Sequence, residues 1–232
     1  MNKESRITLV IASASPSAEK VDKIQQFANC AGCPVDVIFY ENNRSSLTEI
    51  YQQELEESTN DVIVFTHDDI EALRDGWGAE VLRILSENPQ YGILGVAGCK
   101  CYGMDGNYKW WDKKNNLRGM IFHGNEKNSW LSIYSPYNTK SDVEEVSIID
   151  GVFMACVKSR LHYGFDTNIK GFHFYDIDFC ISNFGFKDCK IGVTNKICLR
   201  HDSDGMTNEQ WEENGKFVIE KHKNKLPLKI FK

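Results

Sequence analysis

The stretch Asp61-Val62-Ile63-Val64-Phe65-Thr66-His67-Asp68-Asp69-Ile70 decides the fold. Its first half, Asp61 to Phe65, is rich in β-branched and apolar residues and predicts a short buried strand. The strand ends abruptly at one imidazole and two carboxylates. A parallel strand in an α/β sheet delivers its carboxyl end to the crevice where ligands bind. We therefore expect the functional site at this point of the chain.

The two adjacent carboxylates, Asp68 and Asp69, allow two interpretations. Neighbouring anions repel, so the pair favours a bound cation or cationic ligand. The alternative is that they cap a following helix, as Asp often does. Spacing alone does not separate the two.

Apolar runs alternate with amphipathic segments along the rest of the chain. We expect strands at 7–12, 35–40, 61–65, 91–98 and 190–193, two strand-like runs within 145–157 that are interrupted at Asp150-Gly151, and helices at 18–29, 47–55, 76–87 and about 208–223. The opening order of strand, helix, strand, helix, strand predicts right-handed crossovers and a parallel sheet, and hence an α/β protein.

Composition narrows the class of protein. A chain of 232 residues can form one large domain or two small ones. The net charge of −6 argues against nucleic acid as a partner. A nucleotide ligand stays compatible with this charge, because a bound divalent metal would supply the positive charge.

The residues before the first strand are polar, so we expect no secretory leader, and no apolar window is long enough to predict a membrane span. Eight cysteines without a leader predict reduced thiols in the cytoplasm. The Cys30/Cys33 and Cys99/Cys101 pairs could bind zinc together, but the second pair lacks the spacing of a zinc knuckle. We interpret both pairs as structural.

An aromatic-rich insertion occupies residues 99–138. It contains Tyr102, Tyr108, Trp110, Trp111, Phe122, Trp130, Tyr134 and Tyr137. Such a segment can form hairpins that cover the sheet, or a wall of a sugar or acceptor cleft, since aromatic faces pack on the apolar faces of sugars. We expect a mixture of both.

A second acidic pair, Asp176 and Asp178, follows an aromatic run at 171–175. If the segment is helical, both acids lie in its first turn, where the helix dipole favours negative charge. Helix capping is again the alternative.

The ordered set of motifs resembles the GT-A glycosyltransferases of glycosyltransferase family 2. It consists of His67-Asp68-Asp69 after a strand, Asp150-Gly151 between strands, the aromatic run into Asp176-x-Asp178, and the late His201. The resemblance extends from Ile7 to His201, and the run Leu47–Tyr51 looks closest to the subgroup named for a streptomycin-biosynthesis protein. It implies a GT-A fold, with a Rossmann-like, mixed and mainly parallel sheet flanked by helices.

The same resemblance implies one domain over residues 1–232. Residues 1–98 would bind the nucleotide sugar, and residues 99–232, with the insertion 99–138, would bind the acceptor. Asp69 matches the last acid of the motif that holds Mn²⁺ or Mg²⁺, and His201 matches a late metal-binding His. Oxygen ligands with one imidazole suit these ions better than zinc.

Further site residues follow by analogy with the family. Asp176 matches the catalytic base, although Tyr175 stands where the family has Glu. The donor side would comprise Ala12, Ser13, Ser15, Glu41, Asn42, His67 and Asp68, with His67 at a position where an acid is common. The acceptor side would comprise Trp110, Trp111, Asp150, Gly151 and Asp178.

The resemblance implies an inverting, metal-dependent glycosyltransferase. It would move a sugar from a nucleoside-diphosphate sugar to a hydroxyl of a glycan or polysaccharide precursor. The Tyr175 and His67 departures motivate an alternative, a non-catalytic carbohydrate- or nucleotide-binding module on a degenerate scaffold. A nucleotidyltransferase is disfavoured because the loop 12–17 lacks a basic residue. Peripheral contact of the slightly basic end, 226–232, with the inner face of a membrane stays open, as does a homo-oligomer.

Overall fold

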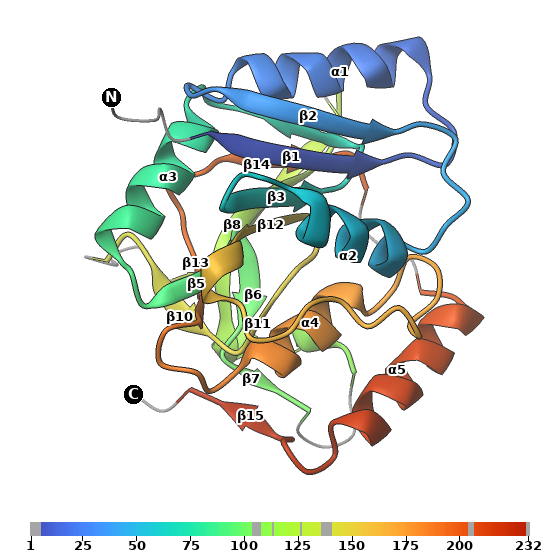
Figure 1. The fold of residues 1–232 in the computed structure, drawn as a ribbon, viewed down its shortest axis with the longest axis vertical. Helices are drawn as coiled ribbons and strands as arrows, with labels where there is room; N and C mark the ends of the chain where they lie inside the picture. Colours follow the sequence, from blue (N-terminus) through green and yellow to red (C-terminus); the bar gives the residue numbers. More distant parts are fainter. Residues whose placement is uncertain are drawn as a thin grey trace.

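The computed structural model describes residues 6–103, 108–112, 114–125, 127–135, 141–203 and 207–230. Its largest sheet has the strand order β10-β13-β5-β12-β3-β1-β2 (Figure 1). The bounds are β1 (Ile7–Ala12), β2 (Val35–Tyr40), β3 (Val62–Thr66), β5 (Tyr91–Gly95), β10 (Glu144–Val146), β12 (Phe153–Val157) and β13 (Lys190–Val193).

The strand directions make this a mixed sheet. β1 runs parallel to β2 and β3, as the opening order of elements predicted. β5 and β13 form a second parallel pair. β12 lies between the two groups and is antiparallel to both β3 and β5. The expectation of a mixed, mainly parallel α/β sheet is therefore confirmed.

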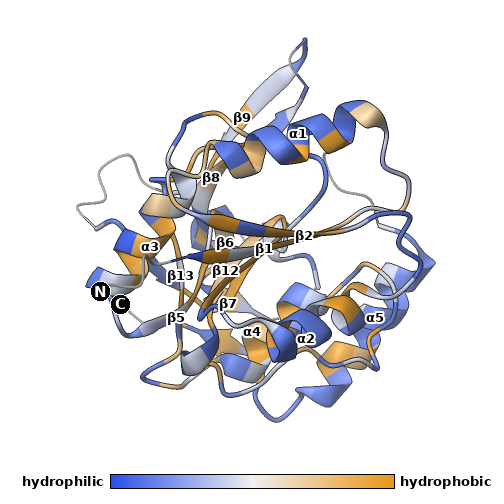
Figure 2. Cartoon of the chain, turned by 45° about the horizontal axis from the view of Figure 1, so that its top comes forward, coloured by the Kyte–Doolittle hydropathy of each residue, from blue (hydrophilic) through white to orange (hydrophobic). Residues whose placement is uncertain are grey.

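Helices cover both faces of this sheet (Figures 1 and 2). α1 (Ala18–Asn29) and α3 (Trp77–Glu87) lie on one face, and α2 (Leu47–Glu57), α4 (Tyr175–Asn183) and α5 (Glu209–Lys221) lie on the other. Alternate residues of a strand point to opposite faces, so Leu9 and Ile11 join the core under α1 and α3, while Val10 joins the core under α2 and α4. A capping box, formed by Ser46 and Glu49, begins α2.

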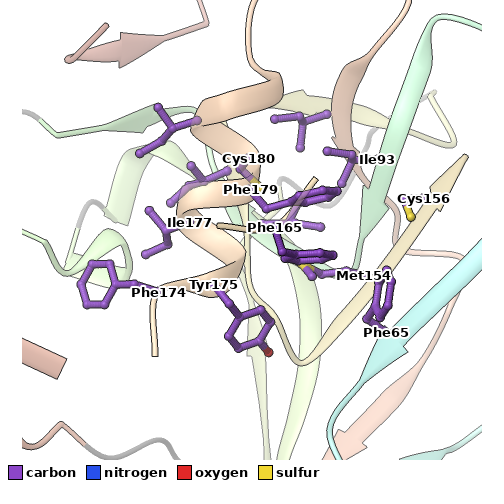
Figure 3. Close-up of a cluster of buried hydrophobic side chains, with 14 of the residues drawn as sticks. Phe65, Ile93, Met154, Cys156, Phe165, Phe174, Tyr175, Ile177, Phe179 and Cys180 are labelled. Carbon is purple, nitrogen blue, oxygen red and sulfur yellow. The ribbon is translucent and has the colours of Figure 1, made fainter. Parts of the chain in front are cut away.

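The core beneath α4 is largely aromatic. Phe165 and Phe179 stack with centroids 4.2 Å apart and planes 9° apart. Figure 3 shows them beside Phe65 and Met154, with Tyr175 at the first turn of the helix. This packing fixes the direction in which the start of α4 points.

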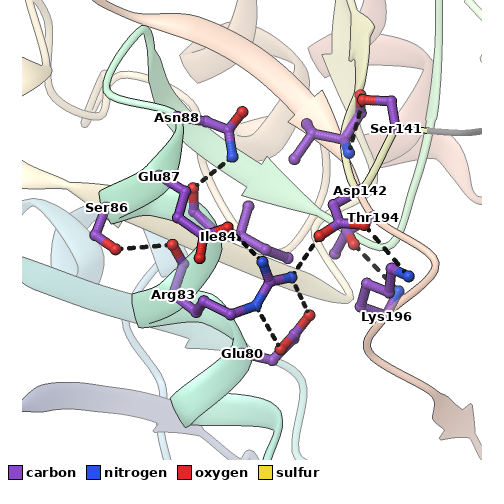
Figure 4. Close-up of polar contacts among 11 residues, drawn as sticks. Glu80, Arg83, Ile84, Ser86, Glu87, Asn88, Ser141, Asp142, Thr194 and Lys196 are labelled. Carbon is purple, nitrogen blue, oxygen red and sulfur yellow. Dashed lines mark hydrogen bonds and ion pairs between the residues drawn. The ribbon is translucent and has the colours of Figure 1, made fainter.

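A polar network joins α3 to the segments beside β10 and β13, at one edge of the large sheet. Arg83 contacts Glu80 and Asp142, each at 2.6 Å, and Asp142 also contacts Lys196 at 3.3 Å (Figure 4). These side chains are partly exposed and screened by solvent, so each pair contributes little to stability.

A smaller sheet carries much of the aromatic insertion. Its order is β11-β6-β8-β14-β4, with β9 paired to β8, and β7 pairs separately with β15. The bounds are β4 (Ile70–Ala72), β6 (Ala97–Cys99), β7 (Cys101–Tyr102), β8 (Leu117–Gly124), β9 (Ser129–Ile133), β11 (Ile148–Ile149), β14 (Leu199–His201) and β15 (Leu228–Lys229).

Two expectations about strands were too simple. The single strand expected at 91–98 is divided, because the chain leaves the large sheet after Gly95 and enters the small one as β6. β11 approaches so closely that a Cβ on Gly98 would lie 2.3 Å from the carbonyl oxygen of Ile148. The segment 145–157 accordingly contributes three strands, β10, β11 and β12, of which β11 belongs to the small sheet.

The helix-cap interpretation of Asp68 and Asp69 is wrong. The chain continues from them into strand β4, and α3 begins only at Trp77, with Gly76 at its N-cap. Within the described ranges, no helix is long and apolar enough to cross a membrane.

Candidate active site

Strand pairing brings the residues of the acid cluster together. His67, Asp68 and Asp69 follow β3 and precede β4. β14 pairs with β4 so that His201 lies opposite Ile70, and the N–H of Asp202 donates to the carbonyl of Asp69 at 2.9 Å. His201 therefore meets the acid cluster although more than half the chain separates them.

Three ligand-type atoms converge at this point. His201 Nε2 lies 3.2 Å from His67 Nδ1 and 3.2 Å from Asp69 Oδ1, and the latter two atoms are 3.9 Å apart. Two ligands each about 2.1 Å from a metal ion and at right angles to it are about 3 Å apart. The spacing of His67, Asp69 and His201 therefore fits one divalent cation.

The charges in the cluster are coupled. Burial opposes charge on both His201 and Asp69, but their mutual hydrogen bond and attraction prevail, raising the pKa of His201 and lowering the pKa of Asp69. Burial and the neighbouring His201 lower the pKa of His67. Asp69 is thus an anion, and His67 is the uncharged imidazole of the group.

The Asp150-Gly151 turn, which precedes β12, lies against this cluster. Thr66 Oγ1 and the N–H of His67 both donate to the carbonyl of Val152, at 2.6 and 3.3 Å. Because β12 pairs antiparallel with β3, the turn is held beside the end of β3. The turn and the cluster therefore face one site.

Asp176, at the start of α4, is fixed to the same turn. One carboxylate oxygen accepts from the N–H of Gly151 and the other accepts from the N–H of Ile177, both at 2.8 Å. Burial, and then the negative charge of Asp150, raise the pKa of Asp176 to about 7. A carboxylate with a pKa near neutrality is suited to take up a proton during a reaction.

A cavity of about 560 Å³ opens onto these groups. His67, His201, Asp150, Gly151 and Asp176 form its polar end. Its remaining wall is strongly aromatic and includes Trp110, Trp111, Trp130, Tyr134, Phe172, Phe174 and Trp211. The insertion thus packs in the core, through the buried Trp110, and also lines a cleft, which is the combination of roles that we expected. Tyr137 lies outside the described residues.

A second cavity, of about 440 Å³, lies on the other side of Asp69. Its lining carries both charges, with Lys20, Lys23, Lys127 and Arg200 beside the acids Glu19, Asp68, Asp69, Glu71 and Asp202. Lys20 Nζ contacts Asp68 at 2.8 Å. The metal-type cluster therefore lies between an aromatic cavity and a charged one.

The expected donor residues at the ends of β1 and β2 lie close together. The N–H of Ser13 donates to the carbonyl of Tyr40 at 2.9 Å, and the N–H of Asn43 donates to the carbonyl of Ser13 at 2.8 Å. Ser13 is buried, whereas Ser15, Glu41 and Asn42 are exposed. In the described part of the chain, neither Ala12 nor these residues line the two cavities.

The expected acceptor residues divide into two groups. Trp110, Trp111, Asp150 and Gly151 line the aromatic cavity. Asp178 does not, because its side chain is 1% exposed and accepts from Lys221 Nζ and His222 Nε2, both at 2.7 Å. It ties α4 to α5 and has no access to a ligand, so we leave it out of the site.

His123 and Phe172 line the aromatic cavity without having been singled out from the sequence. The His123 ring lies 5.6 Å from that of Trp130, and His123 pairs with His201 across β8 and β14. Phe172 packs on His67 with ring centroids 4.9 Å apart. Phe172 stands in the aromatic run before Asp176, which is a usable signal. No local sequence pattern indicates His123, because its position in the cavity depends on the pairing of β8 with β14.

The mixed sheet with its acid cluster after β3 defines the GT-A class of fold. The chain belongs to the glycosyltransferase-like family, whose sequence model matches residues 8–222. No curated protein sequence matches the chain.

Solved structures agree on the fold. GalNAc-T7 with UDP, GalNAc and Mn²⁺ superposes with a TM-score of 0.55 at 12% identity, over 95% of this chain and 48% of that one. TarS of S. aureus gives 0.52 at 10% identity, over 94% and 66%. Mannosyltransferase PcManGT of Pyrobaculum calidifontis, with GDP-Man and Mn²⁺, gives 0.51 at 10% identity, over 92% and 61%. This chain thus spans between about half and two thirds of these proteins, and the likeness concerns the fold.

Proposed function

We propose that the protein transfers a sugar from a nucleoside-diphosphate sugar to a hydroxyl of a glycan or polysaccharide precursor, with inversion at the anomeric carbon. The observation that carries the proposal is the position of Asp176. A carboxylate with a pKa of about 7 projects into an aromatic cavity whose polar end also holds a cluster fit for a divalent cation. Membership of the glycosyltransferase-like family supports the reaction class.

Asp176 is the proposed base. An acceptor hydroxyl must lose its proton as its oxygen attacks the anomeric carbon, and one carboxylate within hydrogen-bond reach suffices to receive it. The two backbone donors, Gly151 and Ile177, hold the carboxylate in place. Attack from the face opposite the departing diphosphate gives the inverted product.

Asp69 and His201 are the proposed protein ligands of Mn²⁺ or Mg²⁺. When bound, the ion neutralises negative charge on the departing diphosphate. Both the GalNAc-T7 and the PcManGT structures contain Mn²⁺ together with a nucleotide or nucleotide sugar, which supports a divalent metal ion here.

The charged cavity is the proposed site of the donor's diphosphate. Lys20, Lys23, Lys127 and Arg200 line it together with five carboxylates, and Lys20, Lys23 and Arg200 are paired with Asp68, Glu19 and Glu71. A divalent cation at Asp69 would therefore supply the further positive charge that a diphosphate needs. The loops with Ala12, Ser13, Ser15, Glu41 and Asn42 would hold the nucleoside, and His67 and Asp68 would lie at the junction with the sugar. Most of the proposed donor residues then lie within residues 1–98, and Lys127 and Arg200 join them from the second half of the one proposed domain of 232 residues.

The aromatic cavity is the proposed acceptor site within residues 99–232. Trp111 is 39% exposed and Trp130 is 50% exposed, so part of each indole ring is accessible to a ligand. Apolar faces of sugar rings pack on such surfaces. Asp150 and Gly151 line this cavity next to Asp176.

A non-catalytic binding module on the same scaffold is the competing proposal, because Tyr175 and His67 depart from the family's pattern. Slow, metal-dependent hydrolysis of a nucleotide sugar by the purified protein distinguishes the two, since a binder gives none. The donor class is tested by thermal shift with a panel of nucleoside diphosphates and nucleotide sugars, with and without Mn²⁺, because ligands of the native state raise its apparent stability. If no member of the panel stabilises the protein, the proposed function fails.

Two finer assignments belong to the same proposal. The Leu47–Tyr51 run supports the subgroup named for a streptomycin-biosynthesis protein. The eight free cysteines support a cytoplasmic location, because disulfides form mainly in oxidising compartments.

A further inference from the structure

The two residues that depart from the family's pattern contact one another. His67 stands where an acid is common and Tyr175 stands where a Glu is usual, and they are 108 positions apart in the chain. Nevertheless, His67 Nε2 lies 3.0 Å from the hydroxyl oxygen of Tyr175. The departures therefore form one structural unit.

The direction of this hydrogen bond follows from a third group. The Tyr175 hydroxyl donates its hydrogen to the carbonyl of Gly151 at 3.0 Å. A phenol has one hydrogen to donate, so its oxygen accepts from His67, and the proton of the neutral imidazole is on Nε2. His67 Nδ1 then carries a free lone pair. That atom is the one that faces His201 Nε2 and Asp69 Oδ1.

The hydroxyl of Tyr175 is held firmly enough to orient the imidazole. Tyr175 is 3% exposed, and its ring packs edge-on against Tyr51 with centroids 5.4 Å apart. The hydroxyl lies at the outer end of this ring, away from the helix (Figure 3). A Cβ at Gly151 would lie 2.1 Å from the hydroxyl oxygen, so only glycine leaves room for it.

We propose that Tyr175 is a positioning residue that presents His67 Nδ1 as a third protein ligand, and that the resulting two-imidazole, one-carboxylate set selects a first-row transition-metal ion over Mg²⁺. This rests on the proposed function and specifies its metal. Mg²⁺ prefers oxygen ligands and sheds water reluctantly. Imidazole nitrogens favour transition metals, and such a three-residue set leaves coordination positions open for oxygens of a diphosphate.

The test measures metal binding by the full chain without any nucleotide. Mn²⁺ is titrated and the free ion followed by electron paramagnetic resonance, with Mg²⁺ added as competitor. Tyr175→Phe is expected to weaken Mn²⁺ binding about 10- to 100-fold, the range for loss of a hydrogen bond that orients a ligand. Mg²⁺ binding should change little, so the preference for Mn²⁺ falls.

Tyr102→Phe is the matched control. The Tyr102 side chain is also buried, at 1% exposed, and its hydroxyl has no hydrogen-bond partner among the described residues. Loss of this hydroxyl should leave Mn²⁺ affinity unchanged. Gly151→Ala disrupts the same hydrogen bond between Tyr175 and His67 without changing either residue, because the added methyl group displaces the Tyr175 hydroxyl. It should reproduce the effect of Tyr175→Phe.

His67→Asp exchanges the nitrogen ligand for an oxygen ligand. We expect it to reduce the preference for Mn²⁺ over Mg²⁺ at least as far as Tyr175→Phe does, and it decides the question should Tyr175→Phe not fold. Nitrogen NMR of the histidine side chains gives an independent readout, since His67 should carry its proton on Nε2 in the wild type and lose that preference in Tyr175→Phe.

Two results would overturn the inference. One is a Mn²⁺ affinity and Mn²⁺/Mg²⁺ ratio in Tyr175→Phe equal to the wild type. The other is an equal loss in Tyr102→Phe, which would mark a general effect of losing a buried hydroxyl. The proposed function fails separately, when the metal preference is as described but no donor is bound or turned over.

Discussion

The carboxylate of Asp176 accepts a hydrogen bond from the N–H of Gly151 at 2.8 Å, while the carbonyl of the same glycine accepts one from Tyr175. A single peptide segment therefore positions both the proposed base and the residue that orients His67. Asp176 and Tyr175 are adjacent at the start of α4, so the proposed base and the residue that contacts His67 are held by the same helix start.

Replacement of the base should abolish transfer but spare donor binding. A positioned general base contributes about 10²- to 10⁴-fold to the rate, so Asp176→Asn should lower kcat by at least about 10²-fold. Affinity for the nucleoside diphosphate, measured by calorimetry, should stay within about twofold of wild type, because Asp176 lies away from the charged cavity. Asp188→Asn, at a surface ion pair with His162, is the control. Near wild-type transfer by Asp176→Asn would refute the base assignment.

The pH dependence of transfer should report the same carboxyl group. The pKa of Asp176 is raised to about 7, so the ionised, proton-accepting form increases as pH rises through that value. We expect kcat to increase about tenfold per pH unit below pH 7 and to level off above it. The profile is measured with saturating donor and metal. A flat profile between pH 5 and 8 would contradict the assignment.

The same pKa predicts a pH-dependent effect on stability. The pKa of Asp176 is raised in the folded state, to about 7 against about 3.9 in an unfolded chain. Its relative contribution to stability is therefore fully present below pH 4 and is lost as pH rises through 7. The shift corresponds to at most about 4 kcal/mol. Asp176→Asn should accordingly be more stable, relative to wild type, at pH 8 than at pH 4.

Urea unfolding of both proteins at the two pH values, without metal, measures this difference. Asn cannot accept from both Gly151 and Ile177, so a constant loss of about 1 kcal/mol is expected at either pH. The test is therefore whether the difference in unfolding free energy between wild type and Asp176→Asn changes between pH 4 and pH 8. If the Asp176→Asn difference is the same at pH 4 and pH 8, the raised pKa is wrong.

Loss of the metal-binding carboxylate should uncouple nucleotide binding from metal. Asp69→Asn removes the anion of the cluster, so Mn²⁺ should no longer raise the melting temperature of the protein in the presence of a nucleoside diphosphate. EDTA should have the same effect on the wild type. Equal stabilisation of the wild type by the nucleotide with and without metal would argue against a metal-bridged diphosphate.

Asp178 should behave as a structural residue. Asp178→Ala leaves the charge of Lys221 without this partner and removes the acceptor for the buried His222. Loss of one partner of a buried ion pair typically costs about 3–5 kcal/mol, a decrease that urea unfolding would detect. Acceptor KM should not change at temperatures where the variant is folded. A selective rise in KM would restore Asp178 to the acceptor site.

Much of the fold follows from local sequence patterns. The apolar run 7–12 and the amphipathic segment 18–29 coincide with β1 and α1. The division of 91–98 between two sheets was not predictable, because its cause is the approach of β11, more than 45 residues away. Periodicity reports burial on one face of an element, and it carries no information about such a distant strand.

The candidate site was predictable where its residues follow strands or begin a helix. His67, Asp69 and Asp176 stand at such positions. The contact between His67 and Tyr175 was not predictable from the sequence. Each residue, taken alone, stands in place of an acid that is usual in the family, and nothing in the sequence relates the two. The assignment of Asp178 to the acceptor site has a related weakness. Helical periodicity places this residue in the first turn of a helix, but it does not reveal the contacts with Lys221 and His222 at the end of α5.

The pairing of β4 with β14 determines where the chain can change in length. Successive side chains of a strand point to opposite faces, so one residue inserted within Leu199–His201 would turn the imidazole away from Asp69. The preceding loop is exposed at Asn195 and Lys196, where an extra residue can be accommodated without moving the register. Insertions and deletions in homologous chains should therefore collect at that loop and be excluded from the three residues after Cys198.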